Sequence, residues 1–181
     1  MFKKPDILHI EDLAKTKHFC IQSLDLKFSN GKKRRYERLK SSSKGAVLVI
    51  PMLDNDTVLM IYEYCGGTDK YELALPKGKV DANETIIDAA NREMMEEVGY
   101  GAKKLSLLKS VTLAPGYQSN KTHIILAQDL YPKTMDGDEP EPLVVVKHKL
   151  SKLDELLKNE DLTEARSILA LYIVRDLLKN K

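Results

Sequence analysis

The sequence predicts an α/β or α+β sandwich, in which several short strands and a few helices share a core. Short runs rich in Val, Ile, Leu and Tyr recur along the chain, and one strongly periodic helical segment separates them near its middle. Two further helical segments close the sequence. With 43% hydrophobic residues among 181, the chain can bury a substantial core.

The N-terminal segment is predicted to form a β-hairpin. Residues 18–28 alternate loosely between apolar and polar side chains and end at Ser29-Asn30-Gly31. Asn-Gly favours a type I′ turn, in which both central residues have positive φ. Residues 32–39 then form the returning strand, and residues 41–45, rich in serine, form a joint. We therefore expect an N-terminal hairpin region over residues 1–44 and a main domain over residues 45–181.

The main domain is predicted to mix strands with one central helix and a helical end. Val98 closes an apolar stripe along the central helix, and Gly99 supplies its stop. Thr163 and Glu164 make a suitable opening for the last helix. The expected strands cover residues 46–53, 57–64, 71–75, 105–108, 123–127 and 143–146, and the expected helices cover 84–98, 152–157 and 163–178.

Charge and composition exclude several classes of protein. The chain has 29 Lys and Arg against 27 Asp and Glu, a formal charge of +2, which argues against a disordered tail and against bulk nucleic-acid binding. Cys20 and Cys65 are too few for a disulfide framework or a cysteine zinc site. The N-terminus has no apolar segment typical of a secretion signal, and the longest apolar run is too short to cross a bilayer. We therefore expect a cytoplasmic protein that binds neither nucleic acid nor membrane.

Three carboxylates are predicted to gather on one face of the central helix. Glu93, Glu96 and Glu97 stand at positions i, i+3 and i+4, so they project within about 60° of one another. Arg92 points about 100° away and would relieve their repulsion only partly. A solvated acidic helix face would show the same composition. Oxygen ligands of this kind also suit Mg²⁺, which is usually shared with substrate phosphates.

The spacing of this segment resembles the Nudix box. Gly78 is followed after five residues by Glu84, and after seven more by Arg92-Glu93-Met94-Met95-Glu96-Glu97-Val98-Gly99-Tyr100. The resemblance implies a Nudix fold, an α/β/α sandwich of mixed sheet with flanking helices, here with an added N-terminal hairpin. It also implies hydrolysis of nucleoside diphosphates linked to another moiety, through a metal-activated water.

The resemblance assigns roles to the residues of the box. Glu93 and Glu97 are implied as principal ligands of Mg²⁺, or of Mn²⁺, and Glu96 as an auxiliary ligand with a catalytic role. Glu84 and Arg92 would hold the geometry of the loop and helix. Lys77 would offer its backbone carbonyl as a further ligand.

Two features outside the box resemble the ADP-ribose pyrophosphatase branch of the family. Pro115 lies sixteen residues after Gly99, and Tyr117 close by would touch the substrate. The segment Asp136-Gly137-Asp138-Glu139-Pro140-Glu141-Pro142 resembles the acidic loop of those enzymes, with Glu139 implied as the catalytic base and Glu141 as an extra metal ligand. Those two glutamates could exchange roles, and an ordinary acidic surface turn remains an alternative.

Phrases along nearly the whole chain, such as FSNGKKRRYER and GDEPEPL, resemble the bacterial ADP compounds hydrolases of this branch. The implied activity is hydrolysis of ADP-ribose, NADH and short diadenosine polyphosphates to release AMP. A Nudix hydrolase of other specificity, such as one for nucleoside triphosphates or longer diadenosine polyphosphates, is an alternative, as is a regulator that senses ADP-ribose without cleaving it. One departure concerns Glu63, which stands where related enzymes often carry an arginine that contacts pyrophosphate.

The basic segment 32–44 is the expected substitute for that arginine. It contains seven Lys and Arg residues and one acid, Glu37. The resemblance implies that this region pairs with a second subunit in a homodimer and helps line its substrate site. Arg35 and Arg38 are the expected phosphate contacts, because guanidinium binds phosphate bidentately. An edge strand guarded by charge against aggregation is the alternative.

Overall fold

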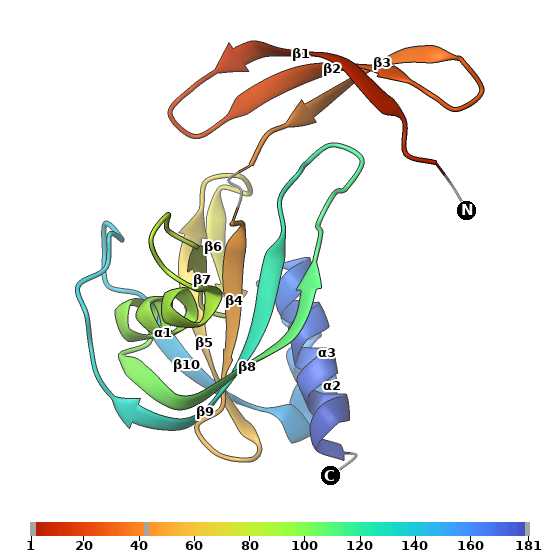
Figure 1. Ribbon diagram of the computed structural model, residues 1–181. Helices are drawn as coiled ribbons and strands as arrows, with labels where there is room; N and C mark the ends of the chain where they lie inside the picture. Colours follow the sequence, from red (N-terminus) through yellow and green to blue (C-terminus); the bar gives the residue numbers. More distant parts are fainter. Residues whose placement is uncertain (1–2, 42–43, 180–181) are drawn as a thin grey trace. The chain divides into compact units, whose positions relative to one another are not determined.

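The computed structural model describes residues 3–41 and 44–179 (Figure 1). Ser42 and Ser43 of the expected joint lie outside the described residues. The chain forms two compact units. The first consists of Met1–Gly45 and Thr112–Lys121, and the second of Ala46–Val111 and Thr122–Lys181. Residues 112–121 therefore belong to a different unit from the strands on either side of them.

The first unit is built on a three-stranded antiparallel sheet in the order β1-β2-β3. Its strands are β1 (Asp6–Lys15), β2 (Cys20–Lys27) and β3 (Lys33–Leu39). The predicted β2–β3 hairpin is confirmed. Strand β1 was not predicted, because all ten of its residues are exposed and its apolar residues do not alternate regularly.

The predicted type I′ turn of this hairpin is wrong. Gly31 has a φ of +80°, but Asn30 is not among the residues with positive φ. The amide of Gly31 donates to the carbonyl of Phe28 at 2.9 Å, and the amide of Phe28 donates to the carbonyl of Lys32 at 2.9 Å. This is a three-residue loop that needs one left-handed residue, which the glycine supplies.

The second unit contains two sheets. One has the order β7-β4-β9-β8 with β4 and β9 parallel, and the other has the order β10-β5-β6 with antiparallel pairing. The short strand β7, directly after Pro76, was not predicted because three residues carry no periodicity. The strands are β4 (Ala46–Pro51), β5 (Thr57–Cys65), β6 (Lys70–Ala74), β7 (Lys77–Lys79), β8 (Tyr100–Val111), β9 (Thr122–Pro132) and β10 (Val144–Lys149).

Helices cover the sheets of this unit from two sides (Figure 1). Along β4, Val47 and Val49 join the core under α1 (Ile86–Glu97), whereas Leu48 and Ile50 join the core under α2 (Leu153–Leu156) and α3 (Ala165–Lys179). A short 3-10 turn, Leu150–Lys152, precedes α2. The expected α/β/α sandwich is confirmed. Among the described residues, no helix is both long and apolar enough to cross a membrane.

The central helix begins at Ile86, two residues later than predicted. Thr85 caps it, since the Thr85 hydroxyl accepts from the amide of Asp88 at 3.2 Å and the Asp88 carboxylate accepts from that hydroxyl at 2.7 Å. Gly99 ends the segment with a φ of +72°, as predicted. Glu84 therefore lies in the loop before the helix, where its side chain can reach back toward the backbone.

Candidate active site

The two acidic blocks of the sequence line one cavity in the second unit. Its volume is about 480 Å³, and its walls come from β7, the loop before α1, one face of α1 and the segment 136–139. Seven carboxylate residues line it against three basic ones. The acidic residues are Asp81, Glu93, Glu96, Glu97, Asp136, Asp138 and Glu139, and the basic ones are Lys77, Lys79 and Arg92.

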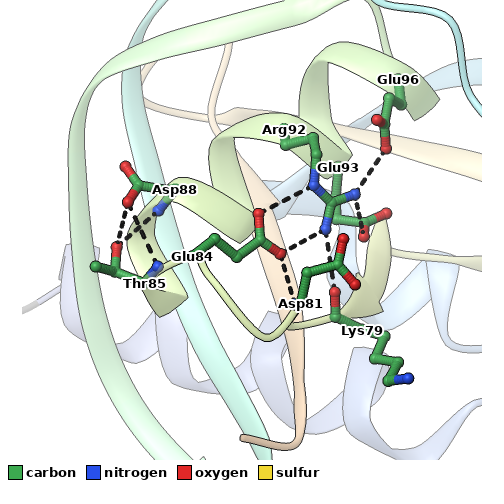
Figure 2. Close-up of polar contacts among 8 residues, drawn as sticks. All are labelled: Lys79, Asp81, Glu84, Thr85, Asp88, Arg92, Glu93 and Glu96. Atoms are coloured by element: carbon green, nitrogen blue, oxygen red, sulfur yellow. Dashed lines mark hydrogen bonds and ion pairs between the residues drawn. The ribbon is translucent and has the colours of Figure 1, made fainter.

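Arg92 holds three glutamates around a single guanidinium group (Figure 2). Its Nε and Nη2 donate to Glu84 at 3.1 and 2.8 Å, and its Nη1 donates to Glu93 at 2.7 Å and Glu96 at 2.9 Å. Nη2 also donates to the carbonyl of Lys79 at 3.1 Å. All five N–H donors thus have an acceptor. Of the three helix glutamates, Arg92 pairs with Glu93 and Glu96, whereas Glu97 accepts from the Lys77 amide, which agrees with the expectation that Arg92 relieves their repulsion only partly.

Glu84 connects this network to the loop before the helix. Its Oε1 accepts from the amide of Asp81 at 2.8 Å, as well as from Arg92 (Figure 2). Hydrogen bonds to Glu84 outweigh desolvation and raise the pKa of Arg92, so the guanidinium stays charged. The loop and the helix face are therefore tied by ionic hydrogen bonds, which are stronger than neutral ones.

Glu93 and Glu97 are almost fully buried, at 8% and 7% exposure. Burial raises the pKa of Glu93 to about 7 and that of Glu97 to about 8, even though Arg92 and Lys77 respectively act in the opposite direction. The amide of Lys77 donates to Oε2 of Glu97 at 2.9 Å. A Cβ on Gly78 would lie 2.0 Å from Cδ of Glu93, so only glycine leaves room for this carboxylate.

These side chains suit a hard divalent cation. Every acidic group lining the cavity offers oxygen ligands, and buried carboxylates with raised pKa values gain from a nearby cation. Among residues 3–41 and 44–179, however, no three Asp, Glu, His or Cys groups gather at one point as a ready-made metal site. The reason lies in the ion pairs, because Arg92 draws Glu93 and Glu96 toward itself while Glu97 accepts from the Lys77 amide.

Lys77 contributes more than backbone to the cavity. Its ammonium group forms a close ion pair with Glu63 on β5, and the two side chains are only 17% and 23% exposed. Burial alone would lower the pKa of Lys77, but the charge and hydrogen bond of Glu63 outweigh it and hold that pKa above its ordinary value. Glu63 thus serves as the partner of a lysine.

The acidic segment divides between two places. Glu139 lines the cavity, and loss of water around its carboxylate, together with the charges of Glu63 and Asp138, raises its pKa. Glu141 does not line the cavity, and its carboxylate accepts a short hydrogen bond from the hydroxyl of Tyr71 instead. Upstream, the amide of Met135 donates to the carbonyl of Met95 at 3.1 Å, which fixes the start of the segment on the end of α1.

The remaining predicted site residues lie in the first unit. Arg38, Pro115 and Tyr117 line a cavity of about 220 Å³, and Nη2 and Nε of Arg38 donate to Gln22 at 3.0 and 3.2 Å. Arg35 lies outside that lining and forms a bidentate pair with Asp25, at 2.8 and 3.0 Å.

Several residues of the larger cavity and its wall were not predicted from the sequence. Asp81 lies inside the matched box, and Asp136 and Asp138 lie inside the acidic segment, so their position was a usable signal. Lys79 lies inside the box as well, whereas the position of Glu63 gave no such signal. The pairing of Glu63 with Lys77 joins two strands fourteen residues apart and leaves no periodic trace in the sequence.

Comparisons with known proteins agree with this geometry. Residues 5–38 match the NudE-type Nudix hydrolase N-terminal domain, and residues 43–172 match the NUDIX domain. The chain is 46% identical over 179 residues to ADP compounds hydrolase NudE of Escherichia coli (strain K12), covering 99% of this chain and 96% of that protein. It is 28% identical over 153 residues to the ADP-ribose pyrophosphatase of Bacillus subtilis (strain 168), covering 83% and 82%. A crystal structure of an ADP compounds hydrolase superposes with a TM-score of 0.92 at 45% identity, covering 99% of this chain and 97% of that one.

Proposed function

The chain belongs to the Nudix hydrolase family, and on that premise we propose that it hydrolyses the pyrophosphate bond of ADP-ribose and related ADP-linked compounds, including NADH and short diadenosine polyphosphates, with release of AMP. The observation that carries this proposal is the cavity itself, which brings Glu93, Glu96, Glu97 and Glu139 together. The names of the relatives in Escherichia coli and Bacillus subtilis support the choice of ADP-linked substrates.

A divalent cation, Mg²⁺ with Mn²⁺ as the alternative, would be held by the carboxylates of the cavity. Glu93 and Glu97 are the proposed principal ligands, Glu96 an auxiliary one, and the Lys77 carbonyl a further oxygen. When bound, the cation would offset phosphate charge and lower the pKa of a water molecule.

The chain's own residues would supply position and proton transfer. Arg92 and Glu84 hold the loop and the helix face in register, which fixes the carboxylates where the substrate arrives. Glu139 is the proposed base, because a carboxylate with a raised pKa accepts a proton more readily near neutral pH. Glu141 is the proposed extra ligand of the cation, and its hydrogen bond from Tyr71 would hold the segment that carries Glu139.

Incubation with ADP-ribose and Mg²⁺, followed by chromatography, should show AMP. A panel of NADH, diadenosine polyphosphates and nucleoside triphosphates, ranked by kcat/KM, should place ADP-linked compounds first. Turnover of triphosphates alone would overturn the substrate assignment, and binding of ADP-ribose without any turnover would show a sensor instead.

Glu97→Gln should lower kcat by roughly 100-fold or more while the far-UV circular dichroism spectrum stays unchanged, because the amide keeps the shape of the carboxylate but not its charge. Unchanged activity in this variant would contradict the ligand assignment. Glu160→Gln, which alters an exposed carboxylate, is the matched control.

We also propose a homodimer that uses the first unit. Strand β1 is exposed along its whole length, and Ile7, Leu8, Ile10 and Leu13 are each 44–50% exposed. Several exposed apolar side chains on one strand are a feature of protein interfaces. In such a dimer Arg35, Arg38, Pro115 and Tyr117 would contact the substrate bound to the partner subunit.

A cytoplasmic location is proposed from cysteine usage. Cys20 and Cys65 are both free thiols, as a reducing compartment allows.

A further inference from the structure

Lys77 differs from the other two basic residues that line the larger cavity, because its side chain is largely buried while much of its hydrogen-bonding capacity is unused. Arg92 has an acceptor for each of its five N–H donors. Lys79 is exposed, whereas the Lys77 side chain is only 17% exposed. Within the described part of the chain, the Lys77 ammonium donates a hydrogen bond to Glu63, whereas an ammonium group can donate three.

Glu63 fixes where that ammonium lies. It belongs to β5, takes no part in the cavity lining, and is itself only 23% exposed. The backbone of Lys77 is held separately, since its amide donates to Glu97 at 2.9 Å and its strand pairs with β4 opposite Leu48. A lysine side chain usually has many rotamers, and an ion pair at its tip restricts them before any ligand arrives.

The surroundings make a positioned ammonium useful here. Seven carboxylates line the cavity, so a substrate that carries phosphates needs cationic partners to enter it. A partly buried ammonium interacts with a phosphate oxygen more strongly than an exposed one, because water screens it less.

We propose that the Lys77 ammonium binds a phosphate oxygen of the substrate and that Glu63 is the positioning residue that holds it at the cavity wall. This assignment rests on the proposed function, since it presumes a substrate with a pyrophosphate group. It gives Lys77 a side-chain role that is independent of its backbone carbonyl.

The first test is Lys77→Met, which keeps the length and the backbone of the residue but removes its charge. Binding of a non-hydrolysable methylene-bridged analogue of ADP-ribose, measured by isothermal titration calorimetry with Mg²⁺ present, should weaken by roughly 10- to 100-fold, the range for a hydrogen bond to a charged group. Lys104→Met is the matched control, because it removes the same charge from an exposed ion pair with Asp129 outside the cavity. Equal affinities of Lys77→Met and wild type would overturn the proposal.

The second test asks whether Glu63 positions the Lys77 ammonium for substrate or whether the ion pair of Glu63 and Lys77 only stabilises the fold. Glu63→Gln should weaken analogue binding by roughly 3- to 10-fold in the wild-type background but should have no further effect in the Lys77→Met background. A structural pair predicts instead that both variants lower the melting temperature and leave the dissociation constant unchanged. Thermal unfolding of each variant is therefore measured beside the calorimetry.

Wild-type turnover of ADP-ribose distinguishes a failure of the Lys77 assignment from a failure of the proposed function. Turnover together with an unaffected Lys77→Met variant would remove this inference and leave the proposed function standing. Absence of turnover and of analogue binding in the wild type would overturn the proposed function and this inference with it.

Discussion

Gly78 leaves the space that the Glu93 carboxylate occupies, because a Cβ there would lie 2.0 Å from Cδ of the glutamate. Its φ does not lie in the left-handed region, so alanine can adopt the backbone conformation, and the group in the way is the flexible end of a side chain. We predict that Gly78→Ala displaces the Glu93 carboxylate and lowers kcat by about 100-fold, while the free energy of unfolding changes by less than about 1 kcal/mol.

Steady-state kinetics over a Mg²⁺ titration and urea denaturation would measure both quantities. Gly67→Ala is the control, since a Cβ at Gly67 meets no atom within 4 Å. Wild-type kcat in Gly78→Ala would mean that Glu93 does not depend on this close approach.

The raised pKa of Glu97 predicts how the stability of the metal-free protein changes with pH. Burial raises its pKa from 4.5 to about 8 in the folded state, so as the pH rises above 4.5 the unfolded chain loses this proton first. The contribution of Glu97 to stability is therefore complete below about pH 4.5 and is lost as the pH rises through about 8. We predict that the melting temperature in EDTA falls between about pH 4.5 and about 8, and that Mg²⁺ reverses the fall because it binds the folded site.

Glu97→Gln isolates this effect from other titrations, because glutamine carries no proton to lose. In EDTA the variant should gain melting temperature relative to wild type as the pH rises across that window. A constant difference between the two proteins would show that Glu97 is ionised throughout.

At the level of elements, Glu164 determines how α3 begins. Directly before the first helical residue, its carboxylate accepts from the amide and hydroxyl of Ser167, both at 2.8 Å, and pairs with Arg166 at 2.6 Å. Thr163, the other half of the predicted opening, instead donates to buried Glu72 at 2.6 Å. Burial would raise the pKa of Glu164, but the hydrogen bonds of Arg166 and Ser167 outweigh it and lower that pKa.

We predict that Glu164→Ala lowers the free energy of unfolding by about 1 kcal/mol at pH 7. Because the folded pKa is lowered, this stabilisation is present above the ordinary carboxyl pKa and disappears as the pH falls through the folded value. Urea denaturation at pH 7 and at about pH 3.5 should therefore show a smaller difference from wild type at the lower pH. Glu160→Ala, at an exposed position, should show little effect at either pH.

Some helices and strands can be predicted from the local sequence, whereas others cannot. Strands β4 and β5 were predicted because their apolar runs are continuous, and α1 because its periodicity and Gly99 agree. Strand β7 pairs with β4 over residues 77–79 and β1 pairs with β2, and neither strand has a regular apolar pattern of its own. Pairing between distant segments is information that a single sequence does not display.

The same distinction holds for the cavity. Helical spacing grouped Glu93, Glu96 and Glu97, and the resemblance to the Nudix box added Glu84 and Arg92 to the same candidate site. Which of these glutamates Arg92 contacts depends on rotamers and burial, and the diversion of Glu141 to Tyr71 depends on where β6 lies. These are tertiary facts that composition and spacing do not contain.

For the whole molecule, the exposed face of β1 makes a prediction about assembly. Leu8→Lys together with Ile10→Lys would place charge on side chains that are 50% and 44% exposed in the single chain. If this strand forms the dimer interface, sedimentation velocity should show the wild type as a dimer and this variant as a monomer. Leu107→Lys, at a 46% exposed position on β8, is the control and should stay dimeric. A wild type that is monomeric at micromolar concentration would exclude the proposed dimer.

The two-segment construction of the first unit limits how such a protein can be rearranged. The end of β3 is held by residues 112–121, because the amide of Leu39 donates to the carbonyl of Tyr117 at 2.7 Å and the amide of Ser119 donates to the carbonyl of Leu39 at 3.2 Å. Deleting residues 1–41 would therefore remove β3 and leave residues 112–121, which belong to the first unit, without the strand to which they are hydrogen-bonded. A chimaera that exchanges this unit between relatives, in evolution or in the laboratory, therefore has to take residues 1–45 and residues 112–121 from the same parent.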